Sequence, residues 1–101
     1  MALANVIPPP YAVETGTTNI SSITWNRVGN VVNVAIDGYT TSTPNVNVTI
    51  TGLPLPKGNA YQKQDLFAAG VWHGYIEQYQ GSWVVKTDGY TLYGSLTYIC
   101  E

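Results

Sequence analysis

Hydrophobic and polar residues alternate along much of this chain, and a period of two is typical of β-strands with one buried face. Residues 46–51 alternate Val or Ile with Asn or Thr. Residues 20–28 are rich in β-branched and aromatic side chains, and a second apolar run at 31–36 follows Gly29 and Asn30. Because a tight turn needs positive φ values that Gly and Asn tolerate, these two runs predict a β-hairpin.

The second half of the chain also consists of short strand-like segments separated by turn residues. Residues 65–75 predict one strand, and residues 76–79 and 83–86 flank a Gln-Gly-Ser turn in a second hairpin. The Asp-Gly pair at 88–89 is a strong turn signal before a last strand at 90–100. No window forms a convincing amphipathic helix, although residues 61–69 have room for one helical turn. The sequence therefore predicts an all-β fold, a small antiparallel barrel or sandwich.

The second hairpin also predicts which side chains share a face. If Gln80 and Gly81 form a two-residue turn, Gln78 faces Trp83 across the hairpin. Ile76 then faces Val85, so this face is largely apolar. The opposite face is aromatic and polar, and it carries Tyr75, Glu77, Tyr79, Ser82, Val84 and Lys86. Such a face can line a ligand crevice or a subunit interface.

The length of 101 residues corresponds to a single domain. Residues 1–11 include three consecutive prolines, which favour an extended path, so we interpret them as the end of a linker from a preceding region. Residues 12–101 form the predicted domain. Charged residues make up only 10% of the chain, and Thr, Ser, Asn, Gln and Tyr must cover the surface instead. Such an uncharged polar surface suits a virion or extracellular protein, or a protein that buries part of its surface in an oligomer.

The charge pattern excludes several classes of partner. The formal net charge is -2, and the basic residues are Arg27, Lys57, Lys63 and Lys86. Four scattered positive charges do not form the basic stripe that nucleic-acid binding requires. No apolar run approaches the roughly 20 residues of a membrane span, so we expect no membrane insertion. Cys100 is the only cysteine, which rules out a disulfide within the chain.

No catalytic or metal-binding motif stands out. His73 is the only histidine, and a triad with Ser82 or Ser95 and an aspartate has no supporting spacing. One His and one Cys far apart give no zinc spacing, and no acidic cluster marks a calcium loop. We therefore expect neither enzymatic activity nor a cofactor. A glycosidase needs two carboxyl groups at its active site. The acidic residues available are Glu14, Asp37, Asp65, Glu77, Asp88 and Glu101.

Aromatic residues are the remaining chemical signal, and they are densest in residues 71–83. Trp and Tyr combine an apolar ring face with a polar edge, which matches the apolar C–H faces and hydroxyl rims of sugars. Trp72 and Trp83 lie beside glycine-rich turns, where binding residues often occur. His73 lies between Trp72 and a glycine, so it is a further candidate for ligand contact. Trp25, inside a strand, is expected in the core or in a subunit contact.

A family resemblance covers most of the chain from about Ile20 onward. The segment at 23–34 resembles the aromatic-x-basic-Val-Gly-Asn-Val-Val hairpin of tail and receptor-binding proteins from phages of Gram-positive bacteria. The Gly-Leu-Pro at 52–54 and the last strand at 92–99 also resemble those domains. Within that group the chain is most similar to the C-terminal head domains of lactococcal phage receptor-binding proteins.

The resemblance implies a β-barrel head that assembles as a homotrimer at the phage tail tip or baseplate, in the virion. It implies non-catalytic recognition of a host cell-surface saccharide, and attachment to other baseplate proteins through an upstream region. The residues that match such a site are His73, Trp83, Asp88, Glu77 and Lys86, to which the local pattern adds Trp72. Two alternatives remain open: a purely structural tail or baseplate domain, and a carbohydrate-binding module of a bacterial enzyme.

Overall fold

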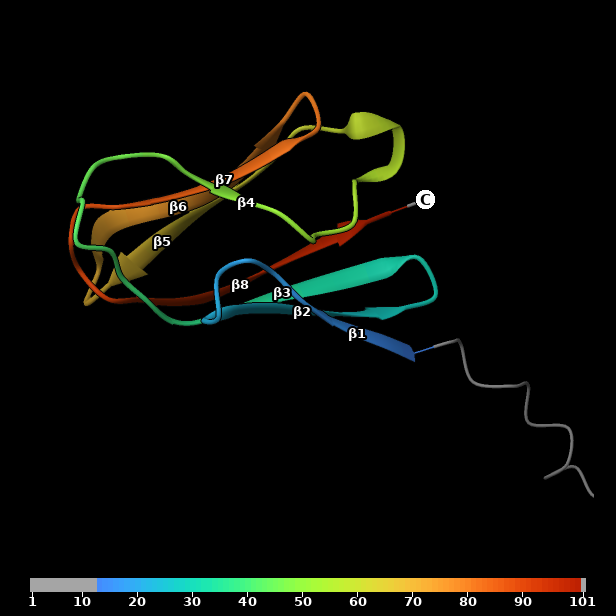
Figure 1. The fold of residues 1–101 in the computed structure, drawn as a ribbon, viewed down its shortest axis with the longest axis horizontal. Helices are drawn as coiled ribbons and strands as arrows, with labels where there is room; N and C mark the ends of the chain where they lie inside the picture. The colour runs from blue at the N-terminus through green and yellow to red at the C-terminus, as the bar shows by residue number, and fades with distance from the viewer. Residues whose placement is uncertain (1–12, 101) are drawn as a thin grey trace, which may run out of the picture.

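A computed structural model describes residues 13–100, which form eight β-strands and one short 3-10 turn, η2 (Figure 1). The strands are short and joined mostly by tight turns, as the alternating pattern predicts. Their bounds are β1 Val13–Thr17, β2 Ile23–Val28, β3 Val31–Tyr39, β4 Val48–Ile50, β5 Gln62–Ala68, β6 Val71–Tyr79, β7 Ser82–Thr87 and β8 Leu92–Ile99, with η2 at Lys57–Asn59.

The strands form two four-stranded antiparallel sheets that lie face to face (Figure 1). The strand order is β1-β2-β3-β8 in one sheet and β4-β7-β6-β5 in the other. The predicted all-β class is therefore confirmed. The architecture is a sandwich, and the closed barrel implied by the family resemblance is wrong, because no continuous ladder of strand pairs runs from one sheet into the other.

Both predicted hairpins are confirmed. In the first, Val28 pairs with Val31, and the turn between them contains Gly29 with φ of 62°. In the second, Tyr79 pairs with Ser82 around Gln80 and Gly81, whose φ values are 51° and 86°. Two consecutive left-handed residues are the geometry that matches the twist of antiparallel strands.

The register of the second hairpin places side chains as predicted. Gln78 pairs with Trp83 and Ile76 pairs with Val85, and all four are buried. The buried amide of Gln78 is satisfied, because its Nε2 donates to the Ala60 carbonyl at 2.8 Å and its Oε1 accepts from the Gly81 N–H at 2.5 Å. Burial of this polar group therefore fixes the turn rather than destabilising the core.

The single strand predicted at 65–75 is wrong. This segment holds the end of β5, a turn, and the start of β6, with Ala69 and Gly70 in the turn at φ of 51° and 79°. Alanine seldom adopts a left-handed conformation, so the sequence gives no turn signal at Ala69. The two strands pair with a register shift between Leu66 and Phe67, which leaves His73 as an extra residue in β6.

Four other boundaries differ from the expectations. The helical turn occurs at Lys57–Asn59, whereas residues 61–69 lie mostly in β5. The first predicted strand begins at Ile23 rather than at residue 20, because residues 18–22 form a turn before it. Strand β4 is limited to Val48–Ile50, and the last strand, β8, begins only at Leu92.

The core lies between the two sheets. Inward-facing residues of β2, β3 and β8 pack against those of β5, β6 and β7, and the Trp83 and Tyr98 rings meet at 5.1 Å between centroids. The Tyr98 hydroxyl donates to the Pro54 carbonyl at 2.5 Å. Buried hydrophobic residues are Ile23, Val32, Val34, Ile36, Tyr39, Ile50, Leu53, Leu66, Ile76, Trp83, Val85, Leu92, Leu96, Tyr98 and Cys100.

The two sides of the sandwich close in different ways. On one side, Asn19 joins the β1–β2 connection to β4: its Nδ2 donates to the Thr49 carbonyl at 3.0 Å, and its Oδ1 accepts from the Thr51 N–H at 2.8 Å. The Asn19 N–H also donates to the Thr51 carbonyl at 3.2 Å. On the other side, edge strands β5 and β8 are in contact, and Leu66 packs closely against Gly94.

The leading segment at 1–11 lies outside the described residues, so the division between linker and domain stays a prediction. Within residues 13–100, no helix is long and apolar enough to cross a membrane.

Candidate functional site

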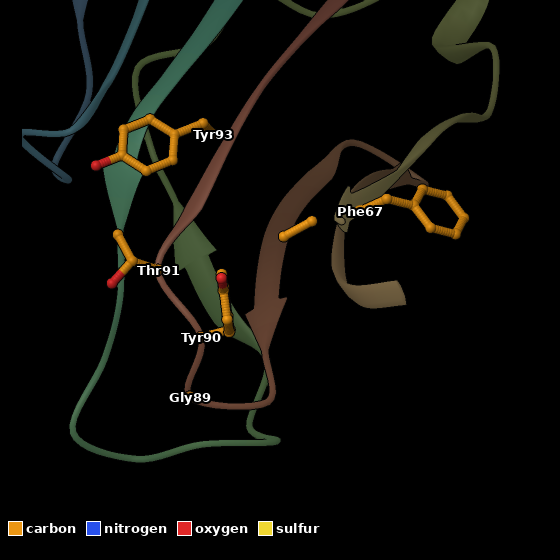
Figure 2. A pocket seen from close by; sticks show the side chains of 6 residues that line it. Phe67, Gly89, Tyr90, Thr91 and Tyr93 are labelled. Atoms are coloured by element: carbon orange, nitrogen blue, oxygen red, sulfur yellow. The ribbon is translucent and has the colours of Figure 1, made fainter. Parts of the chain in front are cut away.

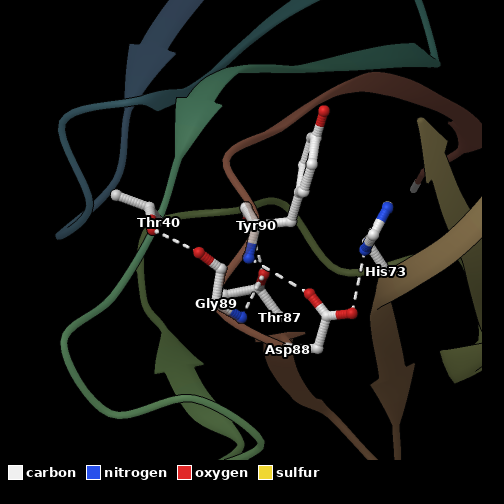
Figure 3. Close-up of polar contacts among 6 residues, drawn as sticks. All are labelled: Thr40, His73, Thr87, Asp88, Gly89 and Tyr90. Atoms are coloured by element: carbon white, nitrogen blue, oxygen red, sulfur yellow. Dashed lines mark hydrogen bonds and ion pairs between the residues drawn. The ribbon is translucent and has the colours of Figure 1, made fainter. Parts of the chain in front are cut away.

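Within residues 13–100, a cluster of polar contacts lies at the end of β7. His73 from β6 and Asp88, the residue after β7, meet through His73 Nδ1 and Asp88 Oδ2 at 2.8 Å (Figure 3). The backbone supports this contact, because the Asp88 N–H donates to the His73 carbonyl at 2.9 Å. The bulge in β6 supplies His73 as the extra residue, and bulges commonly re-aim a side chain in this way.

A dense set of hydrogen bonds fixes the loop that follows Asp88. Its Oδ1 accepts from the Tyr90 N–H at 3.1 Å. The buried Thr87 hydroxyl donates to the Tyr90 carbonyl at 2.6 Å and accepts from the Gly89 N–H at 3.2 Å. The Thr40 hydroxyl reaches the Gly89 carbonyl at 3.5 Å (Figure 3). The loop is therefore tied at Asp88, Gly89 and Tyr90, and Gly89 takes the positive φ of 107° that this path needs.

The ring of Tyr90 stacks on the imidazole of His73. Their centroids are 4.1 Å apart and the planes differ by 16°. His73 is largely covered, with 16% of its side chain exposed, whereas Tyr90 is 50% exposed. One face of the Tyr90 ring is thus occupied by His73, and half of the residue stays exposed.

The electrostatics of the cluster favour ionised Asp88. The hydrogen bond from His73 lowers the pKa of Asp88, and the backbone N–H of Tyr90 lowers it further. Donors aimed at a carboxylate stabilise its charged form. Both oxygens of Asp88 are occupied by these contacts, so the carboxylate acts mainly as the anchor that holds His73 and Tyr90 in place.

A pocket of about 560 Å³ opens beside this cluster, on the side of the sandwich where β5 and β8 lie together (Figure 2). Three aromatic residues line it, and all are exposed: Phe67 at 58%, Tyr90 at 50% and Tyr93 at 65%. In Figure 2 the Phe67 and Tyr93 rings point away from each other. The Tyr93 ring packs over Gly38, where a Cβ atom would lie 3.4 Å from the Tyr93 hydroxyl. The lining residues are Phe67, Ala68, Gly89, Tyr90, Thr91 and Tyr93.

Trp83 is not available at this surface. Its side chain is 3% exposed and packs against Tyr98 inside the sandwich. A ligand would have to open the core to reach the indole, so Trp83 leaves the candidate set. Its partner in the register is the buried Gln78, which places it on the apolar face of the hairpin.

The remaining candidates do not line the pocket and lie on the outer face of the β4-β7-β6-β5 sheet. Trp72 is 41% exposed, and its Nε1 donates to Asp65 Oδ1 at 3.0 Å. Glu77 accepts a hydrogen bond from the Tyr61 hydroxyl at 2.5 Å. The Lys86 ammonium lies 5.9 Å from the Tyr75 ring centroid. Of the six predicted site residues, the structure brings together only His73 and Asp88, which do not line the pocket but lie beside its residue Tyr90.

Among residues 13–100, the triad and the carboxylate pair considered from the sequence are not assembled. Ser82 lies at the β6–β7 turn, at the far end of β6 from His73, and Ser95 lies on the other sheet. Glu77 and Asp88 have separate partners and do not converge. Among residues 13–100, no three His, Cys, Asp or Glu side chains gather as a possible metal site.

The rings of the pocket wall were not among the predicted site residues. Phe67 comes from β5, Tyr90 from the loop after β7, and Tyr93 from β8, so only the pairing of the two sheets brings them together. The Asp-Gly turn at 88–89 was the available signal, because loops beside a rigid scaffold often carry binding residues.

Fold and site together define a small β-sandwich with an aromatic-walled surface pocket. Comparison of the chain with protein-family models, with curated proteins and with solved structures gave no match. The function therefore has to be argued from the site.

Proposed function

We propose that this chain is a phage adhesion domain that binds a saccharide of the host cell wall without altering it chemically. The observation that carries the proposal is the pocket with three exposed rings, Phe67, Tyr90 and Tyr93. Its volume of about 560 Å³ is suited to a small ligand. Aromatic faces pack against the C–H faces of sugar rings, and nearby hydroxyl groups bond to their polar rims.

The residues of the site have distinct roles in this proposal. Tyr90 offers a half-exposed ring, while His73 stacks on that ring and Asp88 holds the Tyr90 backbone N–H. Tyr93 and Phe67 form the other walls, and Thr91 adds a hydroxyl at the rim. Because the loop is already tied by hydrogen bonds, ordering it costs little on binding, which favours affinity. A shallow site of this kind binds weakly by itself, and several copies on a tail tip would add avidity.

The test is calorimetric titration of the protein with saccharide released from lactococcal cell walls. Tyr90→Ala and Tyr93→Ala are each expected to weaken binding about tenfold, since each removes one ring contact. Thr24→Ala, on the exposed outer face of the other sheet, is the matched control and should bind as the unmodified protein does. Unchanged affinity in both tyrosine variants, or no binding by the unmodified protein, would contradict the proposal.

A second candidate, a structural tail or baseplate domain, is favoured by a different feature. At one end of the β1-β2-β3-β8 sheet, Val13, Val28, Val31 and Ile99 are successive neighbours across all four strands. Val13, Val28 and Ile99 are exposed, which is unusual for a continuous apolar row on a free surface. We call these four residues the apolar row.

The apolar row suits a contact between copies of this chain, as in the homotrimer of the first proposal, or with a neighbouring baseplate protein. The two candidates differ in their response to sugar. A virion adhesin should bind cell-wall saccharide at the pocket, whereas a purely structural domain should assemble without responding to it. A carbohydrate-binding module of an enzyme, the remaining alternative, should bind sugar as a monomer.

A further inference from the structure

Within residues 13–100, most exposed aromatic residues lie on or beside the β4-β7-β6-β5 sheet, whereas the Tyr93 ring lies over Gly38 of β3. Half of the exposed aromatic residues are the pocket rings, and the other half lie on or next to the outer face of β5 and β6. The equivalent outer row of the other sheet consists of Thr15, Asn26, Asn33 and Thr97. Within residues 13–100, the exposed aromatic residues are Tyr61, Phe67, Trp72, Tyr79, Tyr90 and Tyr93.

Phe67 connects the pocket to the outer face of the sheet. It lines the pocket and is also the cross-strand partner of Trp72. Side chains of such partners lie close together on one face. The Trp72 indole is held by its hydrogen bond to Asp65 at 3.0 Å, and its centroid lies 6.3 Å from the Tyr75 ring at an interplanar angle of 32°.

The aromatic surface continues to the other end of β6. Tyr75 and Tyr79 point to the same face and are four residues apart, which is roughly 13 Å along a strand. Tyr79 meets Tyr61 edge to face, with centroids 6.2 Å apart. The Tyr61 hydroxyl donates to Glu77, and this bond raises the pKa of Tyr61 to about 12, so Tyr61 remains a neutral donor at physiological pH.

Charges along this surface balance one another. Lys63 lies 3.8 Å from Asp65 and its ammonium is 4.8 Å from the Tyr75 centroid, while Lys86 approaches the same ring. Two lysines and two acids, Asp65 and Glu77, sum to zero. The surface therefore offers ring faces and hydrogen-bonding groups without a net field that would select an ionic ligand.

We propose that Phe67, Trp72, Tyr75, Tyr79 and Tyr61 form an aromatic track that takes an extended, uncharged saccharide chain of several units. This inference rests on the proposed function, because the track continues from the pocket through Phe67. One unit occupies the pocket and the following units lie along β6. Each added ring contact is weak, and the contacts combine because they belong to one ligand.

The experiment measures affinity against chain length. Lactococcal cell-wall polysaccharide is dephosphorylated, partly hydrolysed and separated into two fractions. Chains of roughly two sugar units are shorter than the track, and chains of roughly eight units can extend along it. Calorimetry should give about tenfold tighter binding for the longer fraction. This gain should change less than about twofold between roughly 0.05 and 0.5 M salt, since no ion pair forms.

The double variant Trp72→Ala/Tyr79→Ala should lose the gain with length and keep its affinity for the short fraction. Trp72→Phe keeps an apolar ring and should keep most of the gain, and Thr24→Ala again serves as control. Equal affinity of the unmodified protein for both fractions would overturn the track and leave the pocket intact. Failure of the short fraction to bind would instead overturn the proposed function, and long-chain binding that the double variant abolishes would still support the track.

Discussion

At the scale of single residues, His73 and Asp88 show how a strand irregularity produces a binding surface. The bulge at His73 turns its imidazole toward Asp88 and under the ring of Tyr90. His73 and Asp88 could be selected from the sequence, because a lone histidine beside a tryptophan and an Asp-Gly turn are visible there. Their contact could not, because the bulge depends on pairing between β5 and β6.

The Asp88 contact predicts a dependence of stability on pH. The pKa of Asp88 is lowered in the folded state, mainly by the hydrogen bond from His73, so the carboxylate stabilises the fold above its unfolded pKa. That contribution is lost as pH falls through the folded pKa. Asp88→Asn should therefore have a lower melting temperature than the unmodified protein near pH 6, and this difference should shrink as the pH falls through the folded-state pKa of Asp88.

Thermal melts by circular dichroism from pH 2.5 to 7 measure this difference. Asp37→Asn, an exposed carboxyl of the other sheet, is the control and should give no comparable effect near pH 6. A constant difference for Asp88→Asn at every pH would mean that its carboxylate charge is not the cause.

The two tryptophans of β6 and β7 predict opposite outcomes. Trp83→Ala should reduce the free energy of unfolding by about 3–5 kcal/mol, because it leaves a cavity in the core. Trp72→Ala should cost about 1 kcal/mol or less, since Trp72 lies on the surface. Guanidinium unfolding checks both values.

Trp83→Phe refines the same measurement. The Trp83 indole N–H is buried without a hydrogen-bond partner, so replacing it with phenylalanine removes an unsatisfied donor and should cost much less than alanine does. A cost for Trp83→Ala as small as that for Trp72→Ala would contradict the placement of Trp83 in the core.

At the scale of strands and turns, the sequence predicts hairpins well where the turn residues are the usual ones. Gly29 and Gly81 mark both confirmed hairpins. The β5–β6 turn is missed because its first left-handed residue is Ala69. The alternation also predicted that Gln78 and Trp83 share a face with Ile76, and this already indicated burial of Trp83. The aromatic density of the region drew it into the site instead.

Asn19 stabilises the fold at the same scale, because it links the β1–β2 connection to β4 of the other sheet. Asn19→Ala removes two side-chain hydrogen bonds, to Thr49 and from Thr51, and should cost about 1–2 kcal/mol in the free energy of unfolding. Urea unfolding measures this loss. Asn26→Ala is a matched control, because Asn26 accepts only a long bond of 3.4 Å from Asn33, and its cost should stay within about 0.5 kcal/mol. Equal losses of unfolding free energy in Asn19→Ala and Asn26→Ala would show that the Asn19 hydrogen bonds stabilise the fold no more than the exposed amide of Asn26 does.

At the scale of the whole molecule, the apolar row and the pocket lie in different places. The row crosses one end of the β1-β2-β3-β8 sheet, at the start of β1, where the chain arrives from residues 1–12. The pocket lies beside the loop between β7 and β8. An assembly held through the apolar row would therefore leave the pocket rings uncovered. This separation is what a tail-tip adhesin requires.

The assembly proposal predicts a mass in solution near three times 11.0 kDa by light scattering. Val28→Asp and Ile99→Asp should each give a monomer with an unchanged fold, because a charge in the apolar row opposes its burial. Thr24→Asp, on the same outer face but away from the row, should leave the mass unchanged. A monomeric unmodified protein would favour the carbohydrate-binding module over the phage head.

The Asn19 contacts also bear on how the protein can be produced. Asn19, Ile20 and Ser21 match the acceptor signal for N-linked glycosylation. The glycan would attach to Nδ2, the atom that donates to Thr49 at the edge of β4. Secretion from a eukaryotic host would thus attach a bulky group where the two sheets are joined, and would compete with closure of the sandwich. Bacterial cytoplasm, which lacks this modification, leaves the amide free to form its bonds.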